Sequence, residues 1–144
     1  MTTIALRDGV MAADTWATDD CTATNVRKAV QLANGDVAGG AGDLAPVGRA
    51  LAWLMGDQTG DPPEISGAQI LFTIKGTPYI ADGGWPGIEV RGYTAIGSGA
   101  QGALVAMKLG HGAEAAVRSV FGVDQATGGD VDVLPIGKPK RKRK

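Results

Sequence analysis

Two threonines, Thr2 and Thr3, follow the initiator methionine, and Thr2 is the first residue whose chemistry could define a function. If Met1 is removed, Thr2 carries a free α-amine and a hydroxyl group on the same residue. These two groups can serve as the general base and the nucleophile of one catalytic unit. A β-branched residue at the start of a strand needs no chemistry, so Thr2 alone leaves a catalytic and a structural role open.

Three further features could complete such a site. Asp14 ends the second apolar run, Lys28 lies in a predicted strand, and Gly97-Ser98-Gly99 lies where a predicted strand turns into a helix. A lysine beside the α-amine disfavours the protonated amine, so a group whose reference pKa is about 7.7–8.0 can act as a base at neutral pH. An acid would fix and balance the lysine, and backbone amides at the turn would hold an oxyanion.

The elements that must position these residues begin with a hairpin. The sequence predicts that the chain starts inside a sheet, with no leader before the first strand. Asp8-Gly9 between two apolar runs is a strong hairpin signal because the turn requires positive φ, and Asn34-Gly35 supplies a second turn. Helices are predicted over residues 44–54, 97–109 and 114–121, where apolar residues recur at helical spacing and a glycine follows. Strands are predicted over residues 27–32, from residue 36 onward, and over 68–75, 78–81, 89–96 and 131–134, with loops over 15–24 and 57–66.

This order of elements predicts the fold class. Many antiparallel hairpins with helices segregated from them are typical of a layered α+β sandwich. The length of 144 residues is enough for one hydrophobic core. We therefore expect a single domain over residues 1–135, followed by a basic, disordered tail over residues 136–144.

Composition limits the classes of function. The sequence shows neither a membrane-spanning run nor a signal peptide, and Cys21 is the only cysteine, which favours a cytoplasmic location. The tail holds six of the 14 basic residues, so the remainder has eight bases against 15 acids, a net charge of −7. An acidic body is a poor nucleic-acid surface. The tail could bind a polyanion or act as an import signal, but a solvated chain end is the simpler interpretation.

Five short segments occur in an order that resembles the proteasome β-subunit and HslV peptidase family, within the N-terminal nucleophile hydrolases. The segments are Thr2-Thr3-Ile4 through Ala13-Asp14, Asn25-Val26-Arg27-Lys28, Ala38-Gly39-Gly40-Ala41-Gly42-Asp43, Ile96-Gly97-Ser98-Gly99 and Asp124-Gln125-Ala126-Thr127-Gly128-Gly129. Together they span residues 2 to about 134. Each segment alone is a weak signal, and their shared order carries the resemblance.

The resemblance assigns a role to each segment. It implies that Thr2 is the catalytic threonine, Asp14 the conserved acid and Lys28 the catalytic lysine. Gly39 supplies the oxyanion-hole amide, and Gly40 and Ala41 line the first specificity pocket. The implied supporting groups are Ser98 and, around the amine, Asp124 and Thr127.

The same resemblance implies a fold and an activity. The fold is a four-layer αββα sandwich of antiparallel sheets, and the activity is cleavage of amide bonds in peptides or unfolded protein, with no cofactor and no metal. It also implies a homo-oligomer and an unfoldase partner. Two features depart from the family: Thr127 stands where the family has serine, and only one helix fits between Asp43 and Ser66 where the family has two. Those helices pack against neighbouring rings, so the sequence leaves the assembly open and predicts a reduced helical layer.

Parts of the sequence also fit other kinds of site or function. Gly97-Ser98-Gly99-Ala100-Gln101-Gly102 matches the dinucleotide-binding pattern, but no parallel strand or suitably spaced acid follows it. Cys21 and His111 could form a catalytic pair, although His111 between two glycines is better explained as a helix-end residue. The main rival keeps the fold and drops the chemistry, as a catalytically silent scaffold or assembly subunit. A retained Met1 would favour that rival.

Overall fold

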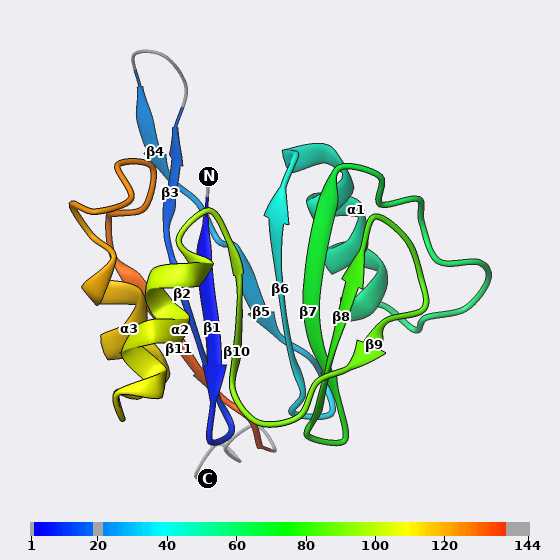
Figure 1. The fold of residues 1–144 in the computed structure, drawn as a ribbon. Coiled ribbons are helices and arrows are strands. Elements are labelled where there is room, and N and C mark those ends of the chain that lie inside the picture. Colours follow the sequence, from blue (N-terminus) through cyan, green and yellow to red (C-terminus); the bar gives the residue numbers. More distant parts are fainter. Residues whose placement is uncertain (1, 19–21, 138–144) are drawn as a thin grey trace, which may run out of the picture.

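The computed structural model describes residues 2–18 and 22–137. Two antiparallel sheets lie between two helical layers (Figure 1). The first sheet has the order β10-β1-β2-β11, with β1 at Thr3–Arg7, β2 at Val10–Asp14, β10 at Thr94–Gly97 and β11 at Val131–Pro135. The second has the order β5-β6-β7-β8-β9, with β5 at Ala29–Gln31, β6 at Val37–Gly42, β7 at Ala68–Ile74, β8 at Thr77–Asp82 and β9 at Ile88–Glu89.

The helices are divided between the two outer faces. Helices α2 (Ala100–Lys108) and α3 (Ala113–Ser119) pack on β1 and β2 of the first sheet, and α1 (Leu44–Met55) packs on β6 and β7 of the second. In the described residues, α1 is the one helix between β6 and β7, and the loop over residues 57–66 follows it. This confirms the predicted α+β sandwich of antiparallel sheets with a reduced helical layer on one side (Figure 1).

Three hydrophobic cores fill the spaces between the four layers. Strand β1 shows how the sequence builds two of them, since alternate side chains of a strand point to opposite faces. Ile4 and Leu6 face the second sheet, whereas Ala5 faces α2 and α3. On the far side of the second sheet, apolar residues of α1 such as Leu51 and Leu54 complete the third core.

The hairpins form where the turn residues predict them. Asp8 and Gly9, between β1 and β2, have φ values of 51° and 74°, the positive φ that this turn needs. Gly35, between β5 and β6, has φ 93°. The register that follows places Ile4 opposite Ala13, which brings Asp14 to the same end of the sheet as Thr2.

Two predictions about elements were wrong. Residues 15–24 are not simply a loop, because β3 (Trp16–Thr18) and β4 (Ala23–Asn25) pair as a two-stranded ribbon that projects beyond the sheets (Figure 1). Residues 89–96 are not one strand: the chain leaves the second sheet after β9 and joins the first as β10. Gly92, with φ 79°, allows the change of direction between them.

Candidate active site

Thr2 lies where β1 and β10 meet at the end of the first sheet. Thr3 pairs with Gly97, and the carbonyl oxygen of Thr2 accepts a hydrogen bond from the Gly99 amide at 3.4 Å and also lies 3.4 Å from the Ser98 hydroxyl oxygen. Gly97 has φ 96°, and a Cβ at this position would collide with the Thr2 carbonyl. The glycine therefore allows the close approach that seats Thr2, whose side chain and backbone are 6% exposed.

A buried ion pair lies beside Thr2. The ammonium of Lys28 lies 3.0 Å from each carboxylate oxygen of Asp14, and the two residues are 5% and 0% exposed. Asp14 also accepts hydrogen bonds from the amides of Thr3 (2.9 Å) and Gly128 (3.1 Å). Burial lowers the pKa of Lys28 from its ordinary value, and the attraction of Asp14 only partly offsets this.

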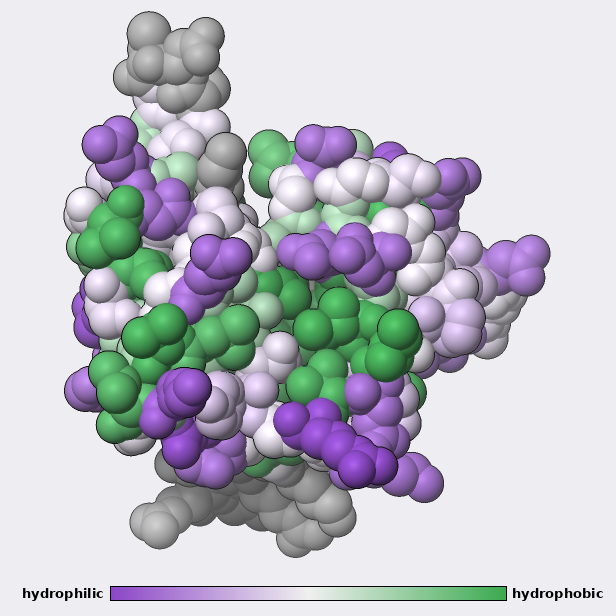
Figure 2. Space-filling model, in the orientation of Figure 1, coloured by the Kyte–Doolittle hydropathy of each residue, from purple (hydrophilic) through white to green (hydrophobic). Residues whose placement is uncertain are grey.

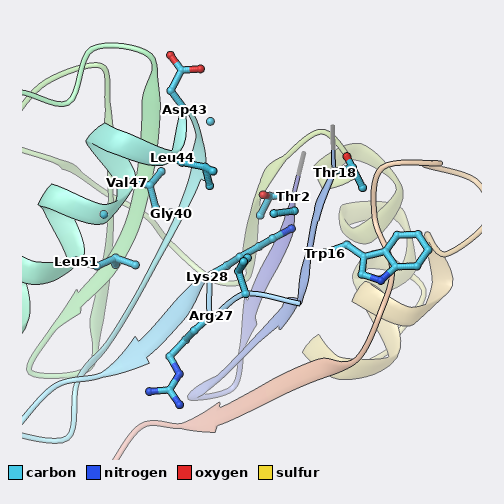
Figure 3. A pocket seen from close by; sticks show the side chains of 14 residues that line it. Thr2, Trp16, Thr18, Arg27, Lys28, Gly40, Asp43, Leu44, Val47 and Leu51 are labelled. Carbon is cyan, nitrogen blue, oxygen red and sulfur yellow. The ribbon is translucent and has the colours of Figure 1, made fainter. Parts of the chain in front are cut away.

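Figure 3 shows the Lys28 side chain running toward Thr2, with its nitrogen at the end nearest to that residue. Lys28 reaches this position because it directly precedes β5 in the second sheet, whereas Thr2 directly precedes β1 and Asp14 ends β2 in the first sheet. The site is therefore assembled by the packing of the two sheets. A cationic group held at this place would disfavour protonation of a nearby amine.

Hydroxyl groups of three residues form a hydrogen-bonded chain around Asp124. The hydroxyls of Ser98 and Thr127 donate to one oxygen of Asp124, at 2.5 Å and 2.7 Å. Because the Thr127 proton is used in this way, the Thr127 oxygen accepts from the hydroxyl of Thr3, 2.7 Å away. Burial would raise the pKa of Asp124, but these hydrogen bonds outweigh it and hold the pKa below its ordinary value. Asp124 is thus an ionised acceptor at neutral pH.

The glycine-rich end of β6 passes the site on the side of the second sheet. Gly40 lines the space beside Thr2, and its amide donates to the carbonyl oxygen of Lys28 at 3.0 Å. A Cβ on Gly39 would instead point at Ile4, inside the core between the sheets. Gly39 and Gly40 thus face opposite sides of β6. The oxyanion role of Gly39 stays a prediction.

Two cavities meet at Thr2. The first, ≈ 400 Å³, lies between α1 and the β3–β4 ribbon, and the second, ≈ 520 Å³, lies between the ends of β6, β7, β8 and β10. They share Thr2, Gly42 and Asp43, and Ala41 lines the second. Figure 2 shows a notch in the upper outline of the molecule between the ribbon and the end of β6. A ligand bound at Thr2 could therefore extend in two directions.

The structure brings together six of the residues that the sequence singled out and adds others. Thr2, Asp14, Lys28, Ser98, Asp124 and Thr127 lie around the end of β1. Trp16 also belongs to the site, although no motif pointed to it, and its ring packs so closely on Gly128 that a Cβ there would lie 2.6 Å from the ring. The side chain of Thr3 is a second residue that no motif pointed to. The Gly128-Gly129 pair was the available signal, because paired glycines mark a close approach.

The competing site predictions receive no geometric support in the described residues. Strand β10 runs antiparallel to β1, so the glycine pattern at residues 97–102 does not follow a parallel strand. The carbonyl of His111 accepts a hydrogen bond from Arg7, and Cys21 lies outside the described residues. Within residues 2–18 and 22–137, no group of three or more His, Cys, Asp or Glu could hold a metal ion, and no helix is long and apolar enough to cross a membrane.

Comparison with known proteins decides the fold. Neither a family model nor a curated protein matches the sequence. Among solved structures, Thiobacillus denitrificans BPH is similar with a TM-score of 0.66 at 18% identity, over 94% of this chain and 98% of that one. HslV from Trypanosoma brucei is similar with a TM-score of 0.61 at 20% identity, over 93% of this chain and 98% of that one.

The chain has the HslV fold. A second structure of Thiobacillus denitrificans BPH, in complex with epoxomicin, is also similar, with a TM-score of 0.65 at 16% identity. The similarity extends over almost the whole of each chain, although the present chain has a single helix between β6 and β7. The fold expected from the resemblance, the αββα sandwich of the HslV type, is therefore confirmed.

Proposed function

We propose that this protein is an N-terminal threonine hydrolase that cleaves amide bonds in peptides or unfolded protein, through Thr2 after removal of Met1. The observation that carries the proposal is the buried Lys28–Asp14 pair, which faces Thr2 at the junction of two cavities. A structural role for this pair does not explain why an ammonium is buried beside a hydroxyl that a ligand can reach. The HslV fold, shared with peptidases, supports the same function.

The reaction would proceed by acyl transfer. The Thr2 hydroxyl oxygen attacks the substrate carbonyl while its proton passes to the Thr2 α-amine, directly or through water. The Gly39 amide, the oxyanion donor that the resemblance implies, would stabilise the negative oxygen of the tetrahedral intermediate. The carbon–nitrogen bond then breaks, and the leaving amine takes the proton back. Water, deprotonated by the same amine, hydrolyses the resulting ester and regenerates Thr2.

The surrounding residues would prepare the amine for this task. Lys28 keeps the amine unprotonated by like-charge repulsion, and Asp14 holds Lys28 in place. Ser98 and Thr127, which both donate hydrogen bonds to Asp124, would orient the amine together with Asp124. In this arrangement no cofactor takes part, because the nucleophile and the base belong to one residue.

The decisive experiment is intact mass spectrometry before and after treatment with a peptide epoxyketone such as epoxomicin. The epoxyketone group reacts with a threonine hydroxyl and a free α-amine together. To expose Thr2, the protein is also made from an N-terminal fusion that is cut directly before this residue. We expect one adduct on the wild-type protein and on Thr2→Ser, and none on Thr2→Ala, whose peptide turnover should fall by at least ~10³-fold.

Each result has a clear meaning. A single adduct that depends on residue 2 would support the proposed nucleophile. An exposed Thr2 that forms no adduct would overturn the proposal and favour the silent scaffold. A folded Thr2→Ala protein with unchanged turnover would exclude Thr2 as the nucleophile.

A further inference from the structure

Two successive residues connect the two halves of the candidate site. The Thr127 hydroxyl donates to Asp124 at 2.7 Å, and the Gly128 amide donates to Asp14 at 3.1 Å. Asp14 in turn holds the ammonium of Lys28. Residues 127–130 form the glycine corner, and its displacement would disturb the charged pair and the hydroxyl chain at the same time.

The ring of Trp16 lies against the glycine corner. A Cβ on Gly128 would lie 2.6 Å from a carbon of this ring, and a Cβ on Gly129 would lie 2.5 Å from another. Gly128 is not among the glycines with positive φ, so its backbone conformation does not call for glycine. The close approach of the Trp16 ring gives the reason that residue 128 has no side chain.

Hydrogen bonds of Thr15 fasten the β3–β4 ribbon to the glycine corner. The Thr15 amide donates to the Gly128 carbonyl at 3.3 Å, and the Asp130 amide donates to the Thr15 hydroxyl oxygen at 2.8 Å. The same hydroxyl donates to the Asn25 side-chain oxygen at 2.8 Å, and Asn25 pairs with Trp16 across the ribbon. The Trp16 ring therefore packs on the corner from a ribbon that is itself fixed to it.

The position of Trp16 is not explained by the hydrophobic cores. Among the described residues, the three cores and the side chains packed against them do not include Trp16, whereas Trp53 and Trp85 pack against the core between α1 and the second sheet. Burial of a large ring in a core is the usual way in which tryptophan stabilises a fold. The Trp16 ring is instead half-buried, against glycines that adjoin residues of the candidate site.

We propose that Trp16 is a positioning residue that acts through the glycine corner. Its ring fixes the Gly128 amide, which holds Asp14. Asp14 then keeps Lys28 beside Thr2 (Figure 3). This inference rests on the proposed hydrolase function, because it concerns the ammonium that would prepare the Thr2 amine.

Loss of the Trp16 ring would change the ionisation of the Thr2 amine in a defined direction. Water would enter beside the charged pair and screen the repulsion by which Lys28 disfavours the protonated amine. The amine would hold its proton up to a higher pH, and less of it would be the free base at neutral pH. Substitution of Trp16 removes none of the charges that surround Thr2 or line the cavities there. These charged groups are Lys28, Asp14, Asp124, Arg27 and Asp43.

The test measures epoxyketone adduct formation on proteins with Thr2 exposed, by intact mass at a series of pH values from about 5.5 to 9. The variants are Trp16→Ala, Trp16→Phe, Gly128→Ala and the double variant Trp16→Ala/Gly128→Ala. Trp85→Ala is the matched control, because Trp85 packs against the core between α1 and the second sheet and lines neither cavity at Thr2. Thermal unfolding gives the Tm of each protein.

We expect Trp16→Ala to lower the rate of adduct formation at pH 7 at least about tenfold. The acidic limb of its pH profile should move to higher pH by about half a unit or more. Trp16→Phe, which keeps an aromatic ring at the glycine corner, should recover most of the rate. Trp85→Ala should lower the Tm but keep the wild-type rate and pH profile.

Gly128→Ala tests the same contact from the other side, and it serves as the test if Trp16→Ala does not fold. The added Cβ would displace the glycine corner from the ring, so this variant should lose rate and shift its pH profile in the same direction as Trp16→Ala. Without the ring the closest obstacle to this Cβ is gone. In the double variant the two losses should therefore not add.

Contrary results separate this proposal from the hydrolase function. Wild-type protein that forms the adduct, with an unchanged rate and pH profile in Trp16→Ala and Gly128→Ala, would overturn the role of Trp16 alone. A lower rate with an unmoved pH profile would do the same, because contact with a ligand in the first cavity changes affinity without changing the ionisation of the amine. Absence of any adduct on wild-type protein with Thr2 exposed would overturn the hydrolase function, and this inference with it.

Discussion

The buried Lys28–Asp14 pair carries a free-energy penalty for the folded protein, because both charges are removed from water. Moving two charges out of water is unfavourable, and their mutual attraction offsets this only with good geometry and further hydrogen bonds. Asp14 meets both conditions, with two Lys28 contacts at 3.0 Å and two backbone amide donors. An apolar pair would fill the same space without this cost. The placement of an ammonium beside Thr2 gives a reason for the charged pair.

We expect Lys28→Met to lower the free energy of unfolding by about 3 kcal/mol, because it leaves a buried carboxylate without its cation. The double variant Asp14→Asn/Lys28→Met should recover part of this loss and remain without epoxyketone adduct. Urea denaturation and intact mass measure the two effects. Recovered stability with no adduct would separate the chemical role of the pair from its structural role.

A matched control is the Arg118–Glu114 pair on α3. This pair is also 3.0 Å apart but half exposed, at i, i+4 spacing. Arg118→Met should change the free energy of unfolding by less than about 0.5 kcal/mol and leave adduct formation intact. If Lys28→Met behaved like Arg118→Met in both measurements, the proposed role of Lys28 would be wrong.

Among the secondary-structure elements, the turn between β5 and β6 holds the turn between β7 and β8 through one carboxylate. Asp36 is 4% exposed and accepts hydrogen bonds from the Lys75 and Gly76 amides, both at 2.9 Å, and from the Thr73 hydroxyl at 2.8 Å. Asn34 also donates to it, at 2.9 Å. Burial would raise the pKa of Asp36, but these donors outweigh it and lower the pKa below its ordinary value.

This shift predicts how stability depends on pH. Because the pKa is lower in the folded protein, the ionised carboxylate stabilises the fold above its unfolded pKa of about 3.9, and the effect is lost as pH falls through the folded pKa. Asp36→Asn should therefore cost about 2 kcal/mol at pH 7 and progressively less below pH ~4. Urea titrations across this range measure it. Exposed Asp61→Asn is the control, and an equal pH profile for both variants would contradict the explanation.

The secondary-structure elements differ in how well the sequence predicts them. Asp8-Gly9 and Asn34-Gly35 predict their turns because positive φ is a local requirement of the chain. The β3–β4 ribbon was missed because residues 15–25 are rich in threonine and aspartate. The contacts that fix the ribbon are distant in the sequence: Trp16 packs on Gly128, and the Thr15 hydroxyl accepts a hydrogen bond from the Asp130 amide. Local polarity resembles a loop when the stabilising partners lie more than a hundred residues away.

For the whole molecule, the candidate site depends on the packing of the two sheets. Asp14 ends β2 of the first sheet, and Thr2 and Ser98 directly adjoin its strands β1 and β10. Gly40 belongs to β6 of the second sheet, and Lys28 directly precedes its strand β5. The five sequence motifs, taken in their order along the chain, were enough to predict the residues of the candidate site. The first cavity could not be predicted, because it forms only when α1 is placed opposite the β3–β4 ribbon.

Positive and negative charge are unevenly distributed along the chain. The six bases of residues 138–144 follow a body with a net charge of −7, and the overall charge of −1 conceals this division. Binding of a basic protein segment to a polyanion releases counterions and weakens steeply with salt. An acidic body repels the same polyanion. We therefore expect any binding of this protein to nucleic acid or heparin to depend on residues 138–144 alone.

Heparin chromatography tests whether polyanion binding depends on residues 138–144 alone. The full chain should be retained at about 50 mM salt and released well below 1 M, whereas a chain ending at residue 137 should not be retained. The body variant Arg49→Gln/Arg91→Gln, which removes two exposed bases, is the matched control and should elute with the full chain. Epoxyketone labelling of Thr2 should be equal in all three proteins, because the tail has no part in the proposed chemistry. Retention of the shortened chain would show that the body itself carries a basic surface, contrary to its composition.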